Sequence, residues 1–176
     1  AVWTSPDGIA WTRVPNAEVF GDRLWQIMNA VARGGPGLVA VGHDGAVNDY
    51  DAAVWTSADG IAWTRVPPDE DVFGGSDVQE MSAVAASDSG LVAVGYRRGA
   101  GGYDAAAWAS VDGSTWTRVS PEQTVFGGLG SQGISGVVAT GPGFVAVGHS
   151  MAVVGWVPRD GDAAVWVSPP PSPSDN

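Results

Sequence analysis

Apolar and polar residues alternate in short runs along most of this chain, and glycine, proline or aspartate separates one run from the next. Residues 37–42 (GLVAVG) and 52–57 (AAVWTS) are typical runs, rich in valine, alanine and tryptophan. Short apolar runs bounded by turn residues are typical of strands, whereas helices need longer periodic segments. The pattern therefore predicts many short strands joined by tight turns, and it excludes helical repeats.

Three motifs recur along the chain 52 or 53 residues apart, except that Trp108 and Trp166 are 58 residues apart. The motif Ser-x-Asp-Gly-x-x-Trp-Thr-Arg-Val occupies residues 5–14, 57–66 and 110–119. A second motif, Gly-Leu/Phe-Val-Ala-Val-Gly, begins 53 residues apart at Gly37, Gly90 and Gly143. A third, an apolar strand that contains tryptophan, occurs at Trp3, Trp55, Trp108 and Trp166. The chain is thus a tandem repeat.

The repeat length is typical of a propeller blade of four strands. We expect an all-β protein, a β-propeller of ~53-residue four-stranded blades, with about three blades per chain. The repeats span residues 1–168 in units of approximately 1–20, 21–73, 74–126 and 127–168, and 169–176 form a Pro/Ser-rich tail. A solenoid with the same period is the alternative architecture.

The first motif resembles the Asp-box (BNR) repeat of sialidase-type propellers, Ser-x-Asp-x-Gly-x-x-Trp, with one residue fewer between Asp and Gly. The resemblance implies that the shared residues form the turn between the third and fourth strands and pack beside it. These residues are Ser5, Asp7, Gly8, Trp11, Ser57, Asp59, Gly60, Trp63, Ser110, Asp112, Gly113 and Trp116.

The resemblance does not extend to sialidase chemistry, which requires a non-repeated arginine cluster. Arg13, Arg65 and Arg118 instead occupy one equivalent position in each repeat, as structural residues do. We therefore expect no enzyme activity and no cofactor. A sialidase-like glycosidase fragment is the less favoured alternative.

Charge restricts the partners of the chain. The formal net charge is −11, and all eight basic residues are arginine, so no basic stripe exists to neutralise phosphates. We expect no nucleic acid partner. The uncharged run 123–158 carries glycine at turn positions of the repeat and predicts strands, not a membrane span. Composition rich in Ala, Gly, Val, Asp and Arg favours a bacterial source with a GC-rich genome, and we expect a secreted or cell-surface protein.

The connections between second and third strands differ among repeats, whereas the Asp-Gly turns hardly vary. Antiparallel strands bring these variable connections to one face, and ligands commonly bind to variable segments on a rigid scaffold. The candidate ligand-binding residues are Trp25 and Trp156 for sugar stacking and Tyr96, Arg97, Arg98 and Tyr103 for a carboxylate or a ring.

Two further groups occupy the same variable connections. Met151, Val153, Val154 and Trp156 lie in an apolar insertion that either folds inward or forms a patch for a partner. Asp44, Asp49 and Asp51 could hold Ca²⁺, although their spacing matches no EF-hand, and ordinary solvated residues are the alternative. His43 and His149 take the position of Tyr96, which favours packing over metal ligation.

The strands are too few for a closed ring. The chain begins with the third and fourth strands of one blade, continues with two whole blades, and ends with the first three strands of another. Either further blades complete the propeller, or copies of the chain form a homo-oligomer or filament by exchanging strands. The leading functional hypothesis is a non-enzymatic, lectin-like binding propeller with a glycan or protein ligand. Structural self-assembly by blade completion is the alternative.

Overall fold

The computed structural model describes residues 1–15, 18–21, 25–75, 78–99, 101–119, 125–127, 130–141, 143–154 and 157–168. These residues form strands and turns, with one short 3-10 helix, η1 (Glu18–Phe20). The predicted all-β class is confirmed.

The described strands form antiparallel sheets in chain order. The N-terminal hairpin pairs β1 (Trp3–Thr4) with β2 (Thr12–Arg13). The first complete sheet contains β3 (Trp25–Gly34), β4 (Gly37–Ala46), β5 (Asp49–Ser57) and β6 (Thr64–Arg65). The second complete sheet contains β7 (Gln79–Ser87), β8 (Gly90–Gly99), β9 (Gly102–Ser110) and β10 (Thr117–Arg118). The three-stranded sheet contains β11 (Ser131–Thr140), β12 (Gly143–Val154) and β13 (Val157–Val167).

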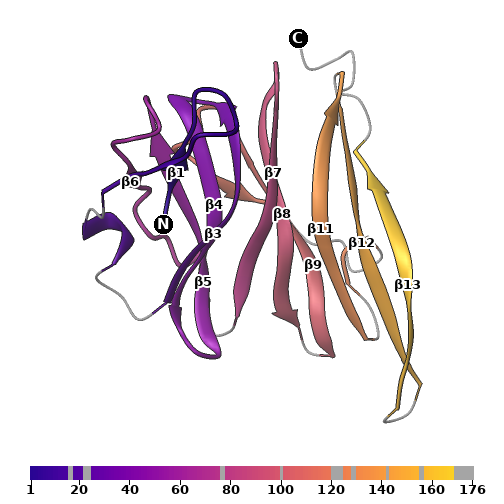
Figure 1. Ribbon diagram of the computed structural model, residues 1–176. Coiled ribbons are helices and arrows are strands. Elements are labelled where there is room, and N and C mark those ends of the chain that lie inside the picture. The colour runs from indigo at the N-terminus through magenta and orange to yellow at the C-terminus, as the bar shows by residue number, and fades with distance from the viewer. Residues whose placement is uncertain are drawn as a thin grey trace.

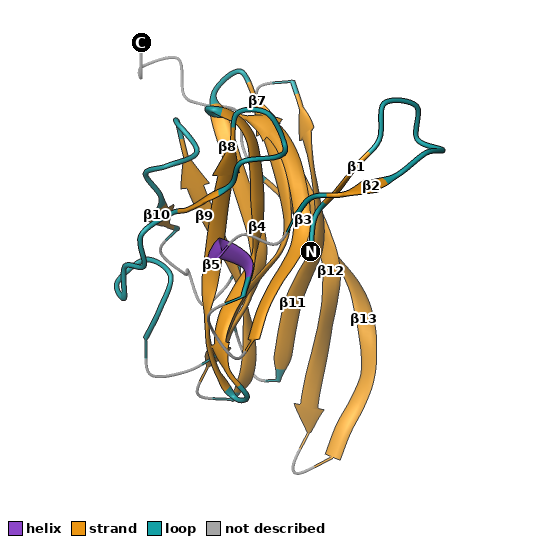
Figure 2. Ribbon diagram, turned by 60° about the vertical axis from the view of Figure 1, so that its left-hand side comes forward, coloured by secondary structure: helices purple, strands orange, loops and turns teal. Residues whose placement is uncertain are grey.

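Consecutive sheets pack face to face, and Figure 1 shows them side by side in the order of the chain. The inner strand β7 contacts β3, β4 and β5, and β11 contacts β7, β8 and β9 in the same manner. The main core lies between the two complete sheets, where Val41 and Val54 pack with Met81 and Trp108. The N-terminal hairpin projects beside β3 (Figure 2).

Each inner strand carries a β-bulge at the same position. The register shifts between Met28 and Ala30, and the equivalent shifts follow in β7 and β11. Glycine lies opposite each bulge, at Gly42, Gly95 and Gly148, where a Cβ would overlap a carbonyl oxygen of the inner strand. The last glycine of the second motif is therefore required, because the backbones of the two strands approach each other closely at this position.

The Ser-x-Asp-Gly turns are held by their own side chains. Ser57 Oγ accepts the Gly60 amide at 2.8 Å, Asp59 Oδ1 accepts the Ile61 amide at 2.8 Å, and Trp63 Nε1 donates to the Gly60 carbonyl at 3.0 Å. The same bonds recur in residues 5–14 and 110–119. Because the turn uses most of the motif, the fourth strand has only two residues, fewer than the AWTRV run suggested.

Candidate functional site

The second strands β4, β8 and β12 end along one edge of the molecule, the lower edge in Figure 1. The connection between β4 and β5 is only Val47 and Asn48, with Asn48 at φ 66°. Asp44 and Asp51 are register partners within the ladder. The strands remain paired almost to the turn, so most residues of this variable connection belong to β4 and β5.

The predicted aromatic and arginine group on β8 and β9 divides into two parts. Arg97 Nη2 lies 3.3 Å from Asp104 Oδ2, whereas the Arg98 side chain is exposed. Adjacent residues of a strand point to opposite faces. Tyr96 and Tyr103 meet edge to face, with ring centroids 5.2 Å apart. The two arginines therefore do not grip one ligand together.

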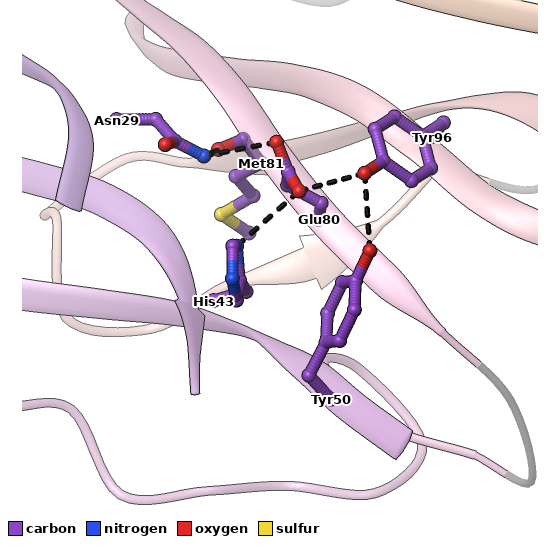
Figure 3. Close-up of polar contacts among 6 residues, drawn as sticks. All are labelled: Asn29, His43, Tyr50, Glu80, Met81 and Tyr96. Carbon is purple, nitrogen blue, oxygen red and sulfur yellow. Dashed lines mark hydrogen bonds and ion pairs between the residues drawn. The ribbon is translucent and has the colours of Figure 1, made fainter. Parts of the chain in front are cut away.

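A polar cluster joins the two complete sheets (Figure 3). Glu80 Oε2 accepts the Tyr96 hydroxyl at 2.7 Å and lies 3.3 Å from His43 Nδ1. Glu80 Oε1 accepts Asn29 Nδ2 at 3.0 Å, and the hydroxyls of Tyr50 and Tyr96 are 3.2 Å apart. The Glu80 carboxylate thus contacts β3 and β4 of the first complete sheet, and Tyr96 extends the cluster to β5.

The electrostatics of this cluster favour an ionised Glu80. Burial raises the pKa of Glu80, but its contacts with His43, Tyr96 and Asn29 outweigh burial, and the pKa lies below the ordinary value. Burial, with the hydrogen bonds to Tyr50 and Glu80, raises the pKa of the Tyr96 hydroxyl. As a carboxylate, Glu80 therefore accepts hydrogen bonds from Tyr96 and Asn29, an arrangement suited to holding sheets together.

A separate pocket of about 410 Å³ opens at the same edge of the first complete sheet. It is bounded by β4, β5 and the connection that follows β6, and it combines acidic groups with an apolar wall. Its described lining consists of Val19, Gln26, Asp44, Asp51, Ala52, Arg65, Pro68, Asp69, Glu70, Phe73 and Gly74. Four carboxyl groups face one guanidinium group in this space.

The acidic pair in this pocket distinguishes the two complete sheets. Asp44 and Asp51 are cross-strand partners, while Arg97 and Asp104 occupy the equivalent pair and form an ion pair. Arg65 Nε lies 3.2 Å from Asp44 Oδ2. Burial, followed by the charges of Glu70, Asp49 and Asp44, raises the pKa of Asp51 to about 6.

The connection that carries Asp69 and Glu70 is fixed at both ends. The Phe73 amide donates to the Asp69 carbonyl at 2.7 Å, which closes a turn around Glu70. The Phe73 carbonyl accepts the Ala52 amide at 3.0 Å, and Trp108 Nε1 donates to the Val72 carbonyl at 2.8 Å. A backbone hydrogen bond to the first complete sheet and a side-chain hydrogen bond from the second therefore position the acidic turn over the pocket.

No family model matches the chain, and no curated protein matches it significantly.

The remaining predicted residues are dispersed. Trp25 begins β3 opposite Gly45 and is 51% exposed, without a second predicted aromatic residue against it among the described contacts. Met151 on β12 is partly buried. Val153 and Val154 pair with the start of β13, and Trp156 lies outside the described residues.

No group of three or more His, Cys, Asp or Glu side chains in the described ranges is arranged to hold a metal ion, the predicted aspartates included. Within the same ranges, no helix has the length and apolar character needed to cross a bilayer.

Sequence analysis missed Glu70, Asp69 and Glu80. A signal was available for Glu80, since the repeat places the uncharged Ile27 and Gly133 at its position. A charged residue at a position that is neutral in the other repeats would have pointed to the Glu80 cluster.

Proposed function

We propose that the chain is a non-enzymatic binding module of a β-propeller, and that the acidic pocket of the first complete sheet binds a small organic cation. The propeller assignment is supported by the packed four-stranded sheets and the repeated Ser-x-Asp-Gly turns. The binding assignment is supported by one observation above all: Asp44 and Asp51 face each other where the second complete sheet has an Arg–Asp pair.

The lining of the pocket matches an organic ammonium group. A volume of about 410 Å³ is in the range of small-molecule sites. Val19, Pro68 and Phe73 provide apolar contact, while Asp51 and Glu70 provide negative charge. An entering cation would replace the proton that Asp51 otherwise retains up to about pH 6. Amines and amino sugars match this lining, because they combine a positive charge with an apolar surface.

Calorimetric titration with glucosamine and N-acetylglucosamine tests the proposal, because the two sugars differ in the charged amine. We expect glucosamine to bind at pH 7.5 and to bind less tightly below pH 6, as Asp51 becomes protonated. We expect no binding of the neutral N-acetylglucosamine. Tetramethylammonium serves as a probe of charge without a sugar ring.

Matched substitutions locate the binding. Asp51→Asn is expected to weaken glucosamine binding at least tenfold, whereas Asp104→Asn, at the equivalent position of the second complete sheet, is expected to leave it unchanged. An equal loss of glucosamine affinity in both variants would contradict the proposal. So would the absence of binding heat with both glucosamine and tetramethylammonium.

A further inference from the structure

The two ends of the series of sheets expose apolar positions that are buried in its middle. Val31 on β3 is 60% exposed, whereas the equivalent Val84 on β7 is 9% exposed. Val147 on β12 is 48% exposed, whereas the equivalent Val94 on β8 is 2% exposed. Each end therefore presents a face that the repeat elsewhere covers with a neighbouring sheet.

We name these faces by their place in the series. The leading face belongs to the first complete sheet and includes Met28, Val31 and Ala40. The trailing face belongs to the three-stranded sheet and includes Val138, Val147, Val165 and Val167.

Inside the molecule, a trailing face always packs on a leading face. Val41 and Val54, in the trailing positions of the first complete sheet, pack with Met81 and Val84, in the leading positions of the second. Val94 packs in the same way with Ile134 at the next junction. The two exposed faces of one chain are therefore complementary to each other in the chemistry and spacing of their side chains.

The leading face is only partly covered. Residues 1–4 of the N-terminal hairpin lie over it and leave an apolar hollow of about 310 Å³, lined by Met28, Val31, Leu38 and Trp63 among others. At the equivalent junction between complete sheets, β7 contacts three strands of the sheet before it. The hollow lies where the inner strands of a preceding sheet would pack.

The strands at the two ends also complement each other. The three-stranded sheet has no fourth strand in the part of the chain that the structure describes, and β13 forms its open edge. The N-terminal hairpin consists of a third and a fourth strand, with Trp3 opposite Arg13 in the register of Trp55 with Arg65 and Trp108 with Arg118. Residues 1–3 and 164–166 have the same sequence, AVW.

A buried glutamine supplies an independent observation. Gln132 is 8% exposed, and its Oε1 atom has no hydrogen-bond partner. In the second complete sheet, the equivalent Gln79 Oε1 accepts Arg118 Nη1 of the fourth strand at 3.0 Å. An unpaired buried acceptor is destabilising. An arginine on a fourth strand added to the three-stranded sheet would lie near Gln132 as Arg118 lies near Gln79.

We propose that a second copy of this chain docks here, with the trailing face of one copy on the leading face of the next. In this junction, β2 of the second copy lies along β13 of the first, with Arg13 opposite Trp166 and Thr12 opposite Val167. Arg13 then donates to Gln132 Oε1 of the first copy. β13 replaces β1, which forms only two register pairs with β2. The association is independent of the ligand pocket.

Light scattering after size exclusion, over a range of concentrations, tests the association. We expect the 17.9 kDa chain to give a mass of at least twice that value. Val31→Glu and Val147→Glu are expected to shift the mass to that of the monomer. Ile61→Glu is the matched control, because Ile61 is also 60% exposed but lies in a turn outside both faces.

Mixing the two blocked variants identifies the junction, since each retains the face that the other has lost. We expect the mixture, but neither variant alone, to form a dimer. A wild-type monomer at every concentration, or an equal loss of association in Ile61→Glu, would overturn the proposal. Circular dichroism checks that each variant is folded.

Cysteine pairing tests the register, because the chain contains no native cysteine. We expect Thr12→Cys and Val167→Cys chains, mixed and oxidised, to form a covalent heterodimer in high yield. Thr12→Cys mixed with Val111→Cys is the control, and equal yields would overturn the register. Gln132→Met should raise the dissociation constant at least tenfold, and an unchanged constant would contradict the role of Arg13.

Discussion

At the scale of single residues, equivalent positions show which side chains depart from the repeat. The pair Asp44–Asp51 replaces the ion pair of Arg97 with Asp104, and the result is a half-buried carboxyl group beside other acids. Like charges in a partly desolvated site disfavour ionisation. The acidic pocket therefore lowers the stability of the folded chain above pH 6 unless a cation neutralises it.

Substitution of Asp51 tests whether its charge lowers the stability of the folded chain above pH 6. The folded pKa of about 6 lies above the ordinary 3.8, so its contribution to stability is complete below pH 3.8 and is lost as the pH rises through 6. We expect Asp51→Asn to raise the free energy of unfolding at pH 8 by about 1 kcal/mol, because solvent screens a half-exposed group. At pH 4 we expect little difference.

Urea unfolding at both pH values measures the effect. Asp88→Asn, on an exposed turn, is the control and should follow the wild type at each pH. A variant less stable than the wild type at pH 8 would show that Asp51 makes favourable contacts as an anion.

At the scale of elements, the sequence predicted strand order well and strand length less well. The recurring apolar runs correspond to β4, β8 and β12 because alternation and turn residues are local signals. The short fourth strands could not be predicted from AWTRV, since the hydrogen bonds that Asp59 accepts and Trp63 donates draw those residues into the turn. Cross-strand pairing likewise continued β4 and β5 through residues expected in a loop.

The bulge and its facing glycine give a prediction at this scale. A Cβ at Gly95 would overlap the Glu80 carbonyl oxygen, and backbone cannot move aside as a side chain can. We expect Gly95→Ala to lower the free energy of unfolding by about 3 kcal/mol. Thermal unfolding measures it, with Gly21→Ala as the control, because nothing lies within 4 Å of a Cβ there. Equal melting temperatures would contradict this account of the glycine.

At the scale of the whole molecule, the repeat period indicated the series of sheets, whereas the site depended on tertiary contacts. Glu80 comes within reach of His43 and Asn29 only because consecutive sheets pack, and Glu70 approaches Asp51 through a folded connection. Neither pair has a recognisable spacing in sequence. The sequence identified the edge that carries the variable connections, but not the particular acidic residues on it.

Equivalent valines provide a test of the packing at this scale. Val94→Ala removes two buried methyl groups and should lower the free energy of unfolding by about 2 kcal/mol. Val147→Ala, at the equivalent exposed position, should change the free energy of unfolding little in dilute solution. The change should grow as the protein concentration rises. Denaturant titrations at two protein concentrations measure the change for both variants. Equal losses of unfolding free energy in dilute solution would contradict an exposed trailing face.

The bulge in each inner strand also limits how the repeat can be engineered. The inserted residue and its facing glycine belong to different strands, so a graft that transfers one without the other forces a side chain onto backbone. A consensus unit for longer or shorter arrays must therefore contain both strands intact. Its boundaries belong in the connection between the fourth strand and the next first strand, where Glu70 can be replaced without disturbing the ladder.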